Sequence, residues 1–110
     1  MMTPEARVKK MVRLYLDEVK KELQDRGYDM HLNMFVPFGY GKRNTLDYTI
    51  CYAGRFVTIE TKRPDEDLTP LQKLTVRAIL RSGGEVFIIS GPEGLQAFKN
   101  WVAKNEHWYA

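Results

Sequence analysis

The sequence contains one cysteine and two histidines in 110 residues, and this scarcity excludes two kinds of site. Cys51 has no second cysteine with which to form an internal disulfide, which favours a reducing compartment. Cys51, His31 and His107 also have none of the spacings that a zinc site requires. We therefore expect neither a disulfide-stapled fold nor a zinc module.

Long apolar runs are missing as well. No segment approaches the roughly 20 residues that a membrane span needs, and the N-terminal residues lack the hydrophobic region of a signal peptide. We therefore expect a cytoplasmic, intracellular protein with no membrane partner, for which a viral or bacterial origin is reasonable.

Internal repeats, low-complexity segments and an interdomain linker are absent from the sequence too. With 44% hydrophobic and 28% charged residues, a chain of this length is expected to form one globular domain over residues 1–110. The net charge of +3 permits a polyanionic partner without requiring one.

Hydrophobic periodicity and turn residues predict an α/β fold. Thr3 as N-cap and Pro4 begin a helix that Gly27 ends. The full predicted order is helix, strand, strand, strand, helix, strand, helix, at residues 4–25, 30–36, 46–52, 55–62, 70–82, 85–89 and after 92. Helices on both faces of a mixed sheet satisfy this order, with the apolar strand at 85–89 buried.

The most informative stretch is residues 46–62, which reads as a β-hairpin. Ala53-Gly54 is a suitable two-residue turn because Gly accepts a positive φ. This turn places Asp47 directly opposite Glu60, with Cβ atoms roughly 5 Å apart. Lys62 shares the face of Glu60, because side chains alternate along a strand. Two carboxylates and an ammonium group on one face predict a divalent-cation site.

Two further polar side chains fall on inward helix faces. Glu5 projects along the apolar stripe of the first helix, so it either reaches the core with a cation or complements the helix dipole. Gln72 lies on the inner face of the helix at 70–82, where it either approaches the site or bonds the local backbone. The sequence alone leaves both alternatives open.

The loop at residues 38–44 combines glycines, aromatic residues and cations just before Asp47. Lys42 and Arg43 could contact phosphates, and Tyr40 could stack on a base or sugar. A solvated turn is the alternative. Arg63, directly after the hairpin, is a further nucleic-acid-binding candidate.

The spacing of Asp47, Glu60 and Lys62 resembles the motif of the PD-(D/E)xK nuclease superfamily, in which Glu-x-Lys follows an apolar run after the Asp. Over residues 4–90 the sequence is most similar to the VRR-NUC branch, the virus-type replication and repair nucleases. The helix start at residues 69–72 and the glycine pair at 83–84 add to the likeness. Leu46 departs from the family, which often has proline before the Asp.

The resemblance implies a restriction-endonuclease-like α-β-β-β-α-β core, with a mixed central sheet flanked by helices and an extra C-terminal helix. It implies hydrolysis of DNA phosphodiester bonds with Mg²⁺, for which Mn²⁺ can substitute. The catalytic residues would be Asp47, Glu60, Lys62 and Gln72. Asp47 and Glu60 would bind the metal, and the family's acidic residue near the first helix favours Glu5 as a further ligand.

The resulting prediction is a metal-dependent endonuclease acting on DNA, with branched or junction DNA as a candidate substrate. The alternatives are a catalytically inactive nucleic-acid-binding module with the same fold and a structural subunit. Because one site cuts one strand, we also expect a homodimer. The candidate contact surfaces are an apolar flank of Leu71, Leu74 and Ala78, and the tail at Trp108 and Tyr109, each of which could instead be buried within one chain.

Overall fold

The computed structural model describes residues 2–34 and 46–109. Within these residues the chain forms one four-stranded sheet in the order β1-β2-β3-β4, made of β1 (His31–Met34), β2 (Tyr48–Tyr52), β3 (Arg55–Thr61) and β4 (Glu85–Ile89). The first three strands pair antiparallel, and β4 pairs parallel to β3. The predicted mixed sheet is confirmed.

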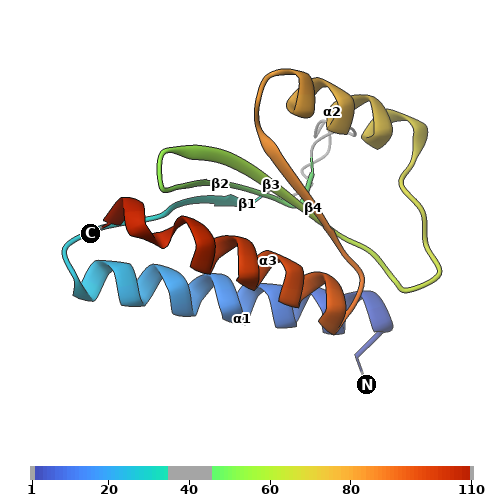
Figure 1. Cartoon of the computed structure of the whole chain (residues 1–110). Coiled ribbons are helices and arrows are strands. Elements are labelled where there is room, and N and C mark those ends of the chain that lie inside the picture. The colour runs from blue at the N-terminus through green and yellow to red at the C-terminus, as the bar shows by residue number, and fades with distance from the viewer. Residues whose placement is uncertain (1, 35–45, 110) are drawn as a thin grey trace.

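Three α-helices of the described part flank the sheet. α1 (Pro4–Asp25) and α3 (Pro92–Asn105) lie together on one side, and α2 (Pro70–Arg81) lies on the other (Figure 1). The short 3-10 helix η1 (Glu106–Tyr109) follows α3. The element order and the α/β class agree with the prediction. In the part of the chain that the structure describes, no helix is both long and apolar enough to cross a membrane.

The start and the buried stripe of α1 follow from its sequence. Thr3 Oγ1 accepts a hydrogen bond from the Ala6 backbone N–H at 3.1 Å, and Pro4 occupies the first helical position. After the helix, Gly27 takes a φ of +86°. The predicted apolar stripe is buried, and it consists of Val8, Val12, Leu16, Val19 and Leu23. Burial of each such side chain stabilises the fold by about 1.5–3 kcal/mol.

The hairpin between β2 and β3 turns at Ala53 and Gly54, as predicted. Both residues have a positive φ, +55° and +73°, as a type I′ turn requires. The strands pair in register from Tyr52↔Arg55 to Tyr48↔Ile59. A residue outside the hairpin also stabilises the turn: the Ala53 N–H donates a hydrogen bond to Tyr109 Oη at 2.7 Å.

Two parts of the fold differ from the prediction. The first strand begins at His31 rather than at Met30; it is described as far as Met34, and residues 35 and 36, where its predicted end falls, lie outside the described part. The strand at 85–89 is not buried throughout: only Ile89 is, and Ile88 is 40% exposed. The reason is its place in the sheet: among the described strands β4 pairs with β3 alone, and no residue of α2 is buried.

Candidate functional site

The open end of the hairpin brings Asp47 and Glu60 together. One step beyond the Tyr48↔Ile59 pair, the register sets Asp47 opposite Glu60, as predicted. The Asp47 backbone N–H donates a hydrogen bond to Glu60 Oε1 at 3.1 Å. The two acids therefore meet where the ladder between β2 and β3 ends.

The Asp47 carboxylate is fixed by the end of β3. Its Oδ2 atom accepts two hydrogen bonds from Thr61, one from the backbone N–H at 2.9 Å and one from Oγ1 at 2.6 Å. Thr61 is fully buried and lies beyond the last residue pair of β2 and β3. The Asp47 oxygen therefore accepts a hydrogen bond from a buried backbone N–H that no residue of β2 pairs with. Within residues 2–34 and 46–109, Oδ1 accepts no hydrogen bond, and the nearby cation is Lys9 Nζ at 3.9 Å. The Oδ2 atom of Asp47 thus has a structural role, while the lone pairs of Oδ1 are available to a ligand.

Glu60 is a buried acid, 4% exposed, with partners on both oxygens. Gln72 Nε2 donates to its Oε2 at 2.8 Å, and Lys62 Nζ lies 3.4 Å from the same atom. Burial raises the pKa of the Glu60 carboxyl above its usual value, and the negative charge of Asp47 raises it further. The Lys62 ammonium and the Asp47 N–H oppose that rise in pKa. A cation at this place would stabilise the ionised acid.

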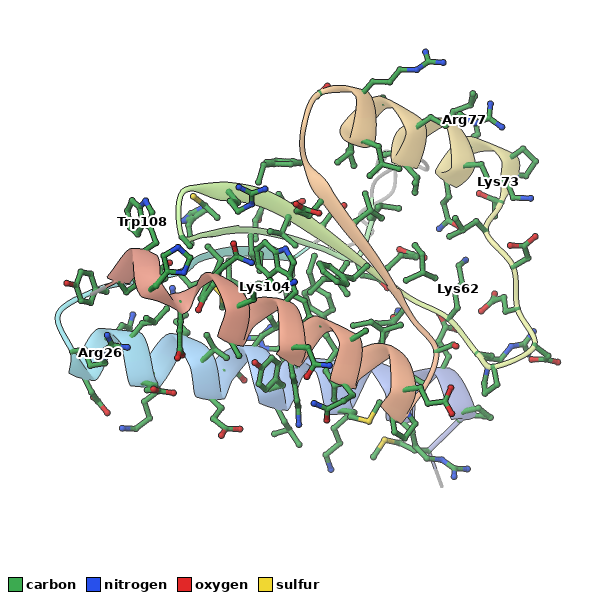
Figure 2. The ribbon with its side chains drawn as sticks, viewed as in Figure 1. Arg26, Lys62, Lys73, Arg77, Lys104 and Trp108 are labelled. Atoms are coloured by element: carbon green, nitrogen blue, oxygen red, sulfur yellow. The ribbon has the colours of Figure 1, made fainter. Side chains whose placement is uncertain are left out.

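Lys62 follows directly after β3 and is 6% exposed. Its backbone N–H donates to the Ile89 carbonyl of β4 at 3.0 Å, which fixes the point from which the side chain leaves. Figure 2 shows Lys62 projecting from the end of β3 toward the side on which α2 lies. The predicted shared face of Glu60 and Lys62 is confirmed by their ion pair.

Gln72 meets both expectations that the sequence left open. As the third residue of α2, it forms a capping box in which Gln72 Oε1 accepts from the Thr69 N–H at 3.0 Å and the Gln72 N–H donates to Thr69 Oγ1 at 3.2 Å. The remaining amide nitrogen is aimed at Glu60. The start of α2 and the buried acid are therefore positioned by the same side chain.

Glu5 lies near the site but does not join the two acids. Its side chain is 42% exposed and forms an ion pair with Lys9, one turn later, at 3.8 Å. Lys9 in turn approaches Asp47 and stands between the two carboxylates. Among the described residues, no group of three or more His, Cys, Asp or Glu side chains is arranged to hold a metal ion. Glu5 as a metal ligand remains a prediction.

The residues present fit a hard divalent cation. Asp47 and Glu60 supply carboxylate oxygens, and Mg²⁺ is commonly bound by one or two carboxylates while it keeps several waters. The negative charge of Asp47 contributes to the raised pKa of Glu60, so an added cation beside the two acids would stabilise both in their ionised form.

The predicted nucleic-acid-binding loop falls outside the described residues, so Tyr40, Lys42 and Arg43 remain predictions. Arg63 is described, and it is exposed beside the buried Lys62, with its Nε 4.0 Å from Glu66 Oε1. Sequence reasoning missed Thr61 and Lys9 as partners of Asp47. Lys9 had one local signal, its position four residues after Glu5 on the same helix face.

Comparisons with known proteins found no matching family model, no matching curated protein and no matching solved structure. The protein has a mixed α/β fold in which the open end of a hairpin, the strand end beside it and the start of α2 bring two carboxylates, a buried lysine and an amide together.

Proposed function

We propose that the protein is a metal-dependent endonuclease that hydrolyses DNA phosphodiester bonds, as a VRR-NUC-like member of the PD-(D/E)xK superfamily. One observation carries this proposal: Asp47, Glu60 and Lys62 of the hairpin stretch and Gln72 of α2 form one connected cluster. These are the residue types that such chemistry uses, and the hairpin register predicts their arrangement.

The burial of the cluster supports a functional role over a structural one. Glu60 and Lys62 are both nearly inaccessible, and taking two charges out of water has a desolvation penalty that their attraction often fails to offset. A well-packed apolar pair of similar volume would often stabilise such a position at least as well. Acids whose pKa is raised by burial, as that of Glu60 is, cluster at functional sites.

The division of roles follows from the contacts. Asp47, through Oδ1, and Glu60 would hold Mg²⁺ or Mn²⁺, which supplies Lewis-acid polarisation of the phosphoryl group and a nucleophilic water near neutral pH. Lys62 contributes a fixed positive charge that offsets the charge of the reacting phosphate or holds the attacking water. Gln72 keeps the Glu60 carboxylate in one orientation.

The proposal also includes that the protein forms a homodimer and that this homodimer binds DNA. The apolar flank of α2 is exposed, with Leu71 at 49% and Leu74 at 57%, so it is not the intramolecular helix contact that the sequence also allowed. Tyr109 is buried within its own chain, which removes it from the candidate contact surfaces, whereas Trp108 is 61% exposed. Two copies joined through α2 would present two sites to the two strands of DNA.

The deciding experiment is incubation of the protein with duplex, single-stranded, flap and four-way-junction DNA in Mg²⁺, Mn²⁺ and EDTA. Metal-dependent cleavage of any of these four DNA substrates supports the proposal, and the pattern of products identifies the substrate structure. Binding without cleavage in either metal would instead identify the protein as an inactive nucleic-acid-binding module.

A further inference from the structure

The outer face of α2 carries a row of cations that the proposed catalytic cluster does not use. Lys73, Arg77 and Arg81 occur at intervals of four residues, so they form one ridge along the helix with a rise of about 6 Å between neighbours. All three residues are exposed. Figure 2 shows Lys73 and Arg77 projecting outward from α2, away from the sheet.

The ridge is unfavourable for the helix itself. α2 contains no acidic residue, so its two successive four-residue pairs, Lys73 with Arg77 and Arg77 with Arg81, are like-charged and destabilise the helix. Within the described part of the chain, neither arginine forms an ion pair. Lys73 pairs with Asp67 at 3.2 Å, but Asp67 is 82% exposed and such a surface pair contributes little.

The cations of α1 are arranged differently. On that helix three four-residue ion pairs form, Glu5 with Lys9, Arg13 with Asp17 and Lys21 with Asp25, although Lys9 and Arg13 in the same row are like-charged. Three cations of α1 thus have an acidic partner on their own helix, whereas α2 has no acidic residue to offer its cations. The row of cations on the helix that supplies Gln72 is therefore suited to bind a polyanion.

We propose that the ridge of Lys73, Arg77 and Arg81 binds consecutive phosphates of a DNA strand and leads that strand to the site. The inference rests on the proposed function, because it takes DNA to be the polyanion. Lys73 lies in the same first turn of α2 as Gln72, which bonds Glu60, so the ridge starts in the helix turn that supplies the site and extends from there along α2. Arginine and lysine on an exposed helix contact phosphates without reading sequence.

The test compares two double variants that each remove two positive charges. Arg77→Gln with Arg81→Gln removes most of the ridge. Lys21→Gln with Lys104→Gln is the matched control, on α1 and α3; Figure 2 shows Lys104 well away from α2. Binding of a fluorescent duplex is measured by anisotropy in EDTA over a range of salt, so that no cleavage interferes, and circular dichroism establishes that each variant is folded.

The ridge variant is expected to lose affinity and to flatten the slope of log affinity against log salt by about two units, one for each phosphate contact. The control is expected to keep the wild-type slope. Equal slopes in wild type and ridge variant, or equal losses in both variants, would overturn the proposal.

Two further arms separate this surface from the proposed function. Wild-type protein that cleaves DNA while the ridge variant binds it normally would refute the ridge alone. Ridge-dependent binding without cleavage in Mg²⁺ would keep the ridge and refute the nuclease. Sedimentation with phosphatidylserine vesicles, in the absence of DNA binding, would overturn the ridge as a DNA surface, because exposed cations beside Leu71 and Leu74 would then serve a membrane.

Discussion

The backbone N–H of Asp47 donates a hydrogen bond to Glu60 Oε1, so each acid of the site has a second task besides its charge. Asp47 also closes the end of β3 through its two hydrogen bonds from Thr61. These hydrogen bonds therefore hold the two acids in one geometry. This preorganisation has an electrostatic cost, visible in the raised pKa of Glu60.

Replacement of Asp47 separates its structural role from its charge. In Asp47→Asn the amide oxygen can still accept the bonds from Thr61, while the repulsion of Glu60 is removed, so stability should be equal to or higher than that of the wild type. Asp47→Ala leaves the buried Thr61 donors without an acceptor and should lower the free energy of unfolding by about 1–3 kcal/mol. Urea denaturation of the metal-free proteins measures the difference, and equal stability of the Ala and Asn variants would contradict the structural role.

Lys62→Met tests the buried cation. The variant leaves Glu60 buried without its ion-pair partner, so the metal-free protein should lose up to about 3 kcal/mol of stability. Added Mg²⁺ should restore part of this loss, because a ligand at one hundred times its dissociation constant stabilises by about 2.7 kcal/mol.

The matched control for that variant is Lys73→Met, which removes an exposed ion pair and should change stability much less than Lys62→Met does. Thermal unfolding with and without Mg²⁺ gives both values. If the two substitutions changed stability equally, the buried ion pair of Lys62 would contribute no more to stability than the exposed ion pair of Lys73.

Gln72→Glu distinguishes the two tasks of Gln72. Glutamate at this position keeps the capping box with Thr69, so α2 should remain intact. It also places a carboxylate where Gln72 Nε2 now lies, 2.8 Å from Glu60, which destabilises the metal-free site. We expect lower stability without metal and a larger stabilisation by Mn²⁺ than in the wild type, measured by thermal unfolding. A variant indistinguishable from wild type in both conditions would place Gln72 outside the site.

The proposed homodimer has its own test in Leu74→Glu. Leu74 is the most exposed leucine of the apolar flank, and a charge there should prevent association while leaving the monomer folded. Sedimentation equilibrium at micromolar concentration should give a dimer for the wild type and a monomer for the variant. A wild-type monomer that cuts both strands of a junction would reject the dimer and leave sequential nicking as the mechanism.

Much of the site could be predicted from local sequence. The Ala53-Gly54 turn fixes the hairpin register, and that register alone sets Asp47 opposite Glu60. The strand period then brings Lys62 beside Glu60. Local rules sufficed here because all three residues belong to one continuous stretch of chain.

The rest depends on tertiary placement. Lys9 approaches Asp47 because α1 packs against the hairpin, a contact that no spacing in the sequence indicates. Glu5 follows the helical stripe inward, yet it lies in the first turn, where its side chain stays half exposed and pairs with Lys9. The exposure of β4 could not be predicted either, because its apolar residues do not reveal that it pairs with β3 alone.

The central claim is that Asp47 and Glu60 hold a metal ion with which the protein hydrolyses DNA. Plasmid cleavage by the wild type, Asp47→Asn and Glu60→Gln tests this claim most directly, with Lys104→Gln as the control. We expect the wild type and the control to cleave in Mg²⁺ and Mn²⁺ and to be inactive in EDTA. Substitution of a residue that only supports the metal ligands typically lowers activity about 10- to 100-fold. Each acid variant should lose more cleavage activity than that. Cleavage that persists in EDTA, or in both acid variants at matched metal concentration, would contradict the account.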